Sequence, residues 1–183
     1  GLKPYLKFGP MAYIIKLRNG LFRNTGGCLS PQNAFYNSIG METLGLRMER
    51  VCDNAKTLAQ FFATEYSDIE VNYPGLAGSK WHDIATEQFG DKFGGIITIR
   101  TGNKKRAFGI IDALKLPLIV SNIGDTKTLV IHPESTLNVH STQEEKETAG
   151  VFDDLIRISV GIEDIDDLID DFKQAIESVK DVY

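Results

Sequence analysis

One arginine interrupts an otherwise apolar run near the C-terminal end of the chain. The run Leu155-Ile-Arg-Ile-Ser-Val160 is bounded by two aspartates and a glycine, a pattern typical of a β-strand. Because side chains alternate across a strand, Ile156, Ile158 and Val160 share one face and Arg157 lies on the other. A guanidinium at this position must be hydrated, paired or bound to a ligand, since burying it without a partner is very costly.

Arg157 is therefore a candidate binding group for an anion. Its guanidinium can form two parallel hydrogen bonds with a carboxylate or a phosphate. It also lies close to the end of its strand, where α/β proteins tend to place binding groups. The alternative is an internal ion pair with a neighbouring aspartate or glutamate, which the strand context alone favours by roughly two to one. The pattern of residues leaves both roles open.

The composition is typical of a soluble globular protein of 183 residues, 42% of them hydrophobic and 25% charged. A net charge of −5 argues against a general nucleic-acid-binding protein, and no apolar stretch reaches the ~20 residues that cross a bilayer. Cys28 and Cys52 have no metal-ligand spacing, and no secretory leader precedes them, which predicts reduced thiols in a cytoplasmic protein. Residues 1–10 resemble neither an initiator methionine, a signal peptide nor a tag, so we expect a fragment of a longer chain.

Several kinds of catalytic motif are missing from the sequence. There is no G-x-S-x-G nucleophile setting, no P-loop and no dinucleotide fingerprint. The three histidines, His82, His132 and His140, lack zinc-like spacing. We therefore predict no catalytic residue and no metal site in this chain, which has the chemistry of a binding half without a catalytic half.

The hydrophobic pattern predicts one long helix followed by an α/β domain. Ser30-Pro31 is a strong helix start, and apolar residues then recur at three- and four-residue steps to about Ala63. A helix of that length commonly joins two domains, and we expect its apolar stripe to be core. Beyond it we predict strands over 69–73, 96–101, 128–131 and 155–160, alternating with helices over 79–89, 104–115, 142–150 and 164–178. This order indicates an α/β (α+β) fold in which about four strands form a sheet covered on one side by helices, although it does not predict the strand order.

A series of short segments, in this order and spacing, resembles one enzyme family. The segments are Leu29-Ser-Pro-Gln-Asn-Ala-Phe35, Gly40-Met-Glu-Thr-Leu44, Leu46-Arg-Met-Glu-Arg50, Val71-Asn-Tyr-Pro-Gly75, Phe93-Gly-Gly95, Asn122-Ile-Gly-Asp125, Leu129-Val-Ile-His-Pro133 and Leu155-Ile-Arg-Ile-Ser-Val-Gly-Ile-Glu-Asp164. They are similar to the C-terminal half of the Cys/Met-metabolism enzymes that use pyridoxal phosphate. The segment Phe8-Gly-Pro10 and the turn Asn122–Asp125 resemble the O-acetylhomoserine sulfhydrylases more than the cystathionine γ-synthases or the γ-lyases. The resemblance covers nearly the whole chain.

This resemblance implies a fold and a domain organisation. The chain would be part of a fold-type I transferase, in which residues 1–29 end the large cofactor-binding domain, residues 30–63 form a long interdomain helix and residues 64–183 form the small C-terminal domain. The Schiff-base lysine and the phosphate-binding glycines of the family lie in the large domain, upstream of Gly1. We therefore expect this chain alone to be inactive and not to hold pyridoxal phosphate covalently. Thr126-Lys127 resembles the Thr-Lys of the family, but its neighbours place it in the Asn122 turn. We therefore do not expect Lys127 to be the Schiff-base lysine.

The resemblance also implies an activity and its binding residues. The intact enzyme would be a cytoplasmic homotetramer that replaces the acetyl group of O-acetylhomoserine with sulfide or a thiol, in methionine biosynthesis. Arg157 matches the arginine that grips the α-carboxylate of the amino-acid substrate, and Asn122 lies on the turn that lines the same side; a purely turn-forming asparagine is as probable. After the dipeptide that corresponds to Ser135-Thr136, the family often continues with Thr-His, whereas this chain continues with Leu137-Asn138. A cystathionine γ-synthase, a γ-lyase (including methionine γ-lyase) and a non-enzymatic small-molecule-binding domain are the alternatives.

Overall fold

The computed structural model describes residues 3–180, which fall into two compact units that meet between Thr43 and Leu44. Residues 1–2 and 181–183, the outermost parts of the predicted segments 1–29 and 64–183, lie outside the described residues. Among the described residues, no helix is both long enough and apolar enough to cross a membrane.

The N-terminal unit is helical. It contains η1 (Lys3–Met11), α1 (Ala12–Leu17), η2 (Arg18–Phe22), α2 (Arg23–Thr25) and α3 (Pro31–Glu42). The predicted start of α3 is confirmed, because the Ser30 side chain accepts a hydrogen bond from the backbone N–H of Asn33 at 3.2 Å.

The prediction of one continuous helix from Pro31 to about Ala63 is wrong. The helical assignment stops at Glu42, Thr43 has a non-helical backbone conformation, and α4 (Leu44–Glu65) follows. The expectation that the apolar stripe is core holds only for the second of these helices. No residue of α3 is buried, whereas seven residues of α4, from Val51 to Phe62, are.

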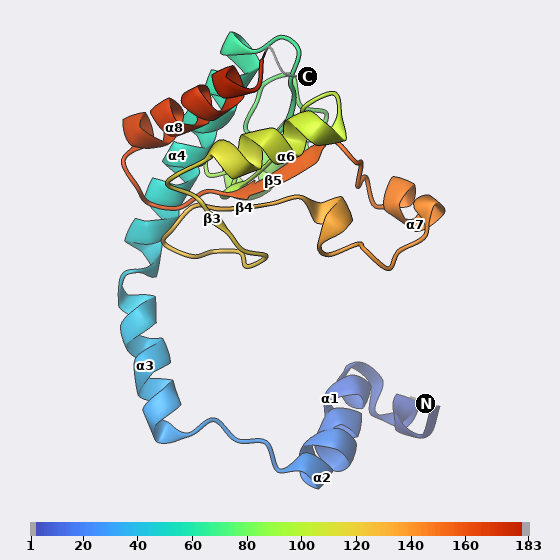
Figure 1. Ribbon diagram of the computed structural model, residues 1–183. Helices are drawn as coiled ribbons and strands as arrows, with labels where there is room; N and C mark the ends of the chain where they lie inside the picture. Colours follow the sequence, from blue (N-terminus) through green and yellow to red (C-terminus); the bar gives the residue numbers. More distant parts are fainter. Residues whose placement is uncertain (1–2, 181–183) are drawn as a thin grey trace. The chain divides into compact units, whose positions relative to one another are not determined.

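The C-terminal unit is built on a five-stranded mixed sheet (Figure 1). Its strands are β1 (Glu70–Asn72), β2 (Ile96–Arg100), β3 (Leu118–Ile119), β4 (Leu129–Ile131) and β5 (Leu155–Ser159), in the order β1-β2-β5-β4-β3. Only β3 and β4 are parallel. The sheet has one strand more than the four predicted, because the two residues of β3 pair with β4. The strand that carries Arg157 is therefore central, with Thr98 on β2 and Ile131 on β4 directly opposite Arg157.

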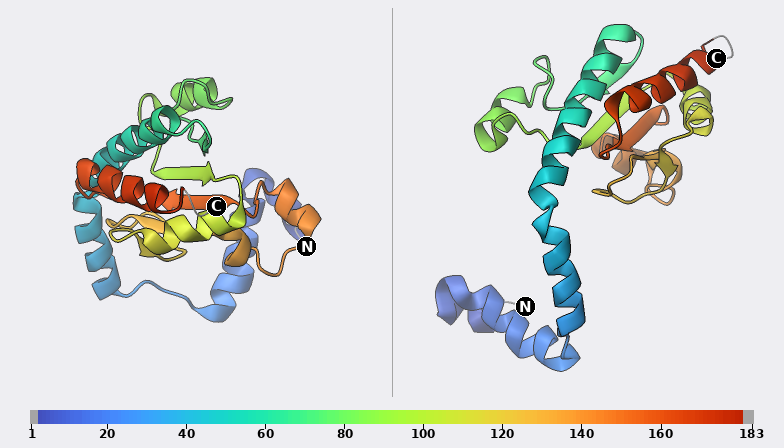
Figure 2. Two further views of the ribbon diagram at one scale, coloured as in Figure 1. Left: turned by 45° about the horizontal axis from the view of Figure 1, so that its top comes forward. Right: turned by 90° about the vertical axis from the view of Figure 1, so that its left-hand side faces the viewer.

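Three helices cover one face of this sheet, as predicted. They are α4, α6 (Lys104–Ala113) and α8 (Ile165–Ser178), which lie together on the same side in Figures 1 and 2. The alternation in β5 is confirmed, since Ile156, Ile158 and Val160 are buried in the core against these helices. Arg157 is only half-buried and lies on the opposite face of the sheet. The fold thus uses one side of β5 for the core, and on the other side Arg157 is half-buried between the buried residues Leu155 and Ser159.

The remaining helices lie away from this core. They are α5 (His82–Phe89), the short η3 (Pro133–Ser135) and α7 (Gln143–Thr148). The capping box predicted at Thr142 is present, with the Thr142 hydroxyl and the Glu145 carboxylate each bonded to the other residue's backbone N–H.

Glu134 of η3 links α6 to α7 through its carboxylate. Its two oxygens accept hydrogen bonds from Lys104 Nζ at 2.8 Å and from Lys146 Nζ at 2.6 Å, so one carboxylate joins the start of α6 to α7. The hydrogen bond from Lys104, followed by that from Lys146, lowers the pKa of Glu134 from its usual 4.5 to about 2. A carboxyl group whose pKa is lower in the folded state stabilises the fold at pH values above its unfolded pKa.

We expect Glu134→Gln to lower the free energy of unfolding by about 1 kcal/mol at pH 7, allowing for the solvent exposure of the lysines. The difference from the wild type should shrink as the pH falls from about 4.5 towards 2, because the wild-type carboxylate is then progressively protonated in both states. Urea denaturation at pH 7 and pH 2.5 measures this. The control is Glu87→Gln, because the side chain of the exposed Glu87 makes no hydrogen bond or ion pair to any described residue. An equal loss of unfolding free energy in Glu134→Gln at both pH values would contradict the stabilising role assigned to the ionised Glu134 carboxylate.

Candidate functional site: an arginine held by backbone carbonyl groups

The guanidinium of Arg157 is held by backbone carbonyl groups. Its Nη2 donates hydrogen bonds to the carbonyl oxygen of Ser121 at 2.7 Å and to that of Asn122 at 3.4 Å. Its Nε is buried and bonds to no described residue, and no bond from Nη1 to a described residue is found either. Burial lowers the pKa of Arg157, but a guanidinium remains protonated at neutral pH. The guanidinium is therefore a positive charge with a fixed orientation, and its Nε and Nη1 have no acceptor among the described residues.

Other arginines of the same unit are paired with carboxylates. Arg100 Nε lies 3.0 Å from Asp154 Oδ1, Arg106 Nη1 lies 2.6 Å from Asp68 Oδ2, and Arg50 also has an aspartate within 4 Å. In residues 3–180 no carboxylate lies within 4.0 Å of the Arg157 guanidinium. The internal ion pair, which strand context alone favoured, is thus not found among the described residues. A half-buried positive charge without a counter-charge is costly unless an anion completes it.

The turn that supplies these carbonyl groups connects β3 to β4. Within it, Gly124 adopts a positive φ of 81°, a conformation that glycine reaches without strain. The backbone N–H of Gly124 donates to the hydroxyl of Ser159 at 3.2 Å. Ser159 and Arg157 are two residues apart on β5 and share one face. The turn is therefore joined to β5 at two points.

The far end of the same turn is held by Glu163. Its carboxylate accepts hydrogen bonds from the backbone N–H of Thr128 at 2.6 Å and from the Thr128 hydroxyl at 2.9 Å. The backbone carbonyl of Glu163 accepts from Asn54 Nδ2 of α4 at 2.9 Å, and Asn54 also bonds to the carbonyl of Gly161. This network fixes the segment after β5 to both α4 and the turn. The cap of α8 is Asp164, whose side chain accepts a hydrogen bond from the backbone N–H of Asp166.

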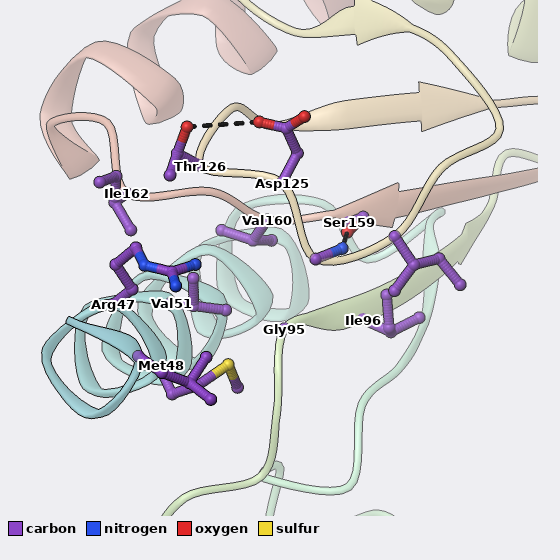
Figure 3. A pocket seen from close by; sticks show the side chains of 13 residues that line it. Arg47, Met48, Val51, Gly95, Ile96, Asp125, Thr126, Ser159, Val160 and Ile162 are labelled. Atoms are coloured by element: carbon purple, nitrogen blue, oxygen red, sulfur yellow. Dashed lines mark hydrogen bonds between the residues drawn. The ribbon is translucent and has the colours of Figure 1, made fainter. Parts of the chain in front are cut away.

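A small cavity of about 220 Å³ lies beside the turn, between α4 and the ends of β2 and β5 (Figure 3). Its walls are mainly apolar and include Met48, Val51, Ile96 and Val160. The lining residues with polar side chains include Ser159, Arg47 and the turn residues Asp125 and Thr126, and the last two are hydrogen-bonded to each other. No lysine lines this cavity.

The described residues do not form a site for pyridoxal phosphate on their own. That cofactor needs a lysine for its Schiff base and a set of donors for its phosphate. Lys127 is exposed, and Lys92, which lines a second pocket, is committed to an ion pair with Asp53 at 2.8 Å. The donor group that the turn and β5 provide is instead the guanidinium of Arg157, whose two parallel N–H groups match the geometry of a carboxylate.

The other candidate groups have structural roles in the part of the chain that is described. His132 is buried, and its Nε2 lies 2.7 Å from the carbonyl oxygen of Asp153, so Nε2 carries the proton and Nδ1 accepts from the Ser135 backbone N–H. Residues 3–180 contain no group of three or more His, Cys, Asp or Glu side chains that could hold a metal ion.

The structure brings Arg157 and Asn122, both predicted as binding residues, to one place. Asn122 contacts Arg157 through its backbone carbonyl, while its exposed side chain forms no hydrogen bond with any described residue. A direct role of either side chain in binding substrate stays a prediction. Sequence reasoning missed Ser121, Ser159 and the Glu163–Thr128 contact. The alternation of β5 placed Ser159 on the face of Arg157, and that was the one signal available for it.

Comparison with known proteins decides the family. The sequence description of the Cys/Met metabolism PLP-dependent enzymes matches residues 11–177, which is most of the chain. The chain belongs to this family.

Relatives within the family have different activities. The chain is 40% identical to the O-acetyl-L-homoserine sulfhydrylase of Corynebacterium glutamicum, over 98% of this chain and 41% of the relative. It is also 40% identical to the L-methionine γ-lyase of Fusobacterium nucleatum, over 87% of this chain and 40% of the relative. The chain thus spans about two fifths of the length of these relatives.

A solved structure agrees with this assignment. An O-acetylhomoserine (thiol)-lyase of Campylobacter jejuni, whose crystal structure contains a pyridoxyl-lysine monophosphate, is 38% identical and superposes with a TM-score of 0.83, over 92% of this chain and 40% of the other. The sheet and its helices therefore have the fold of family members that use pyridoxal phosphate, and pyridoxal phosphate is the cofactor of the enzyme to which this chain belongs.

Proposed function

We propose that this chain is the C-terminal part of a pyridoxal-phosphate-dependent O-acetylhomoserine sulfhydrylase and that it binds the α-carboxylate of the amino-acid substrate. The observation that carries the proposal is the Arg157 guanidinium, half-buried on the face of β5 opposite the core and without a carboxylate partner among the described residues. Family membership and the identity to the Corynebacterium glutamicum sulfhydrylase support the type of reaction.

The chemical role of this chain would be to position the substrate. Bound pyridoxal phosphate supplies the electron sink for the reaction. Arg157 would hold the substrate carboxylate through charge-assisted hydrogen bonds, and the Ser121 carbonyl would keep the plane of the guanidinium fixed. Orienting the amino acid in this way lowers the entropic part of the barrier without any bond being formed by Arg157. No group of this chain needs to act as an acid or a base in that role.

The domain organisation and the assembly belong to the same proposal. Residues 1–29 would end the large domain, and residues 30–63 would connect it to the small domain of residues 64–183, with α4 of this connecting segment packed on the core of that small domain. The intact enzyme would be a homotetramer in the cytoplasm, and the two free cysteines, Cys28 and Cys52, are consistent with a reducing compartment. Light scattering of the intact protein tests the tetramer.

A γ-lyase is the second candidate, because a methionine γ-lyase is as similar in identity as the sulfhydrylase. The two activities separate in one assay of the intact protein with pyridoxal phosphate. A sulfhydrylase forms homocysteine and acetate from O-acetylhomoserine and sulfide, and is inactive with methionine or cystathionine alone. Release of a 2-oxo acid and a thiol from methionine, with no homocysteine formed from O-acetylhomoserine, would exclude the proposed reaction. The absence of turnover with all of these substrates would favour a non-enzymatic binding domain.

A further inference from the structure

Two side chains of β5 clamp the turn between β3 and β4 from the same face of the strand. Arg157 donates to the carbonyl of Ser121 at 2.7 Å, and Ser159 accepts from the N–H of Gly124 at 3.2 Å. The strand residues are two apart and the turn residues are three apart, so the first part of the turn lies along the strand and is held at two points. In Figure 3 Ser159 lies next to the chain that leads through this turn to Asp125.

The central part of this turn has little else to hold it. The side chains of Asn122 and Ile123 are exposed, so the turn contributes no large apolar group to the core. The contacts of Thr126 and Thr128 with the segment after β5 fix the chain only beyond Asp125. Ser159, with 3% of its surface exposed, is therefore the side chain that fixes Gly124 and, through it, the carbonyl groups of Ser121 and Asn122.

We propose that Ser159 is a positioning residue for substrate binding, acting through the turn on the orientation of Arg157. Without this hydrogen bond the turn gains conformational freedom, and the carbonyl groups that fix the guanidinium no longer hold one position. Binding then has to order the turn as well as the substrate, which costs affinity for the carboxylate. This inference rests on the proposed function, because it assigns Ser159 to the same carboxylate site.

The test is the steady-state kinetics of Ser159→Ala in the intact protein with its cofactor. We expect KM for O-acetylhomoserine to rise about tenfold, the effect of one lost hydrogen bond, while kcat and the KM for sulfide change less than about twofold. Ser159→Thr keeps the hydroxyl acceptor, and its added methyl group has room in the adjoining cavity. We expect Thr at this position to retain the wild-type KM within about twofold.

A matched control separates positioning from a general loss of stability. Thr101 is also buried, and its hydroxyl bonds to the carbonyl groups of Asn103 and Asp154, far along the sheet from the turn. Thr101→Val should lower the unfolding temperature without raising KM for O-acetylhomoserine. If Ser159→Ala lowers the unfolding temperature in the same way and leaves KM unchanged, the inference is overturned.

A double-mutant cycle distinguishes this failure from a failure of the proposed function. If Ser159 acts through Arg157, Ser159→Ala should have no further effect on KM in an Arg157→Ala background. Equal effects in both backgrounds would overturn the inference while leaving the carboxylate site in place. If Arg157→Ala itself leaves KM unchanged, the proposed site fails, and the positioning role of Ser159 fails with it.

Discussion

Arg157→Ala in the intact enzyme is expected to raise KM for O-acetylhomoserine by about 100-fold or more. Hydrogen bonds to a charged group contribute about 1.5–3 kcal/mol each, and a bidentate carboxylate would lose two of them. Because these bonds are present in both the bound substrate and the transition state, kcat should change less than KM. Initial rates over a range of O-acetylhomoserine concentrations, at saturating sulfide, measure both constants.

Two variants make this result specific to Arg157. Arg157→Lys keeps the positive charge but loses the planar pair of donors, so we expect it to restore KM only in part. Arg100 lies on the same face of the sheet, two residues along β2 from Thr98, which is directly opposite Arg157. Its guanidinium is paired with Asp154 and stacked on Phe152. Arg100→Ala should reduce stability and leave KM near the wild-type value. An unchanged KM in Arg157→Ala would refute the assignment of the carboxylate site.

Phe172→Ala is expected to lower the free energy of unfolding of the C-terminal unit by about 3–5 kcal/mol. Phe172 of α8 and Phe62 of α4 are both fully buried, and their rings meet edge to face with centroids 5.2 Å apart. This contact joins two of the three helices that cover the sheet, so a cavity here weakens the support of β5. Urea denaturation followed by circular dichroism measures the change.

An exposed phenylalanine provides the comparison for this prediction. Phe89 of α5 has 62% of its surface exposed, and Phe89→Ala should change the free energy of unfolding by less than about 0.5 kcal/mol. A loss below about 1 kcal/mol in Phe172→Ala would show that the contact between α4 and α8 does not carry the stability assigned to it.

The sequence alone determined the local structure around the site. Alternation of apolar residues placed Arg157 on the face of β5 away from the core, and this was correct because side-chain direction in a strand follows from backbone geometry. The helix start at Ser30 and the capping box at Thr142 were likewise predictable, since each depends on residues within three positions of one another. The break at Thr43 was not predicted, because the apolar spacing continues across it.

Tertiary structure alone decided what surrounds Arg157. The strand order 1-2-5-4-3 makes β5 central and brings the turn after β3 over Arg157, and no local pattern encodes a pairing between segments more than 30 residues apart. The same pairing turns the carboxylate of Glu163 towards Thr128 and the hydroxyl of Ser159 towards Gly124. Whether a charged side chain meets an acid depends on which distant residues the fold places beside it. Beside Arg157 the fold places the backbone carbonyl oxygens of Ser121 and Asn122.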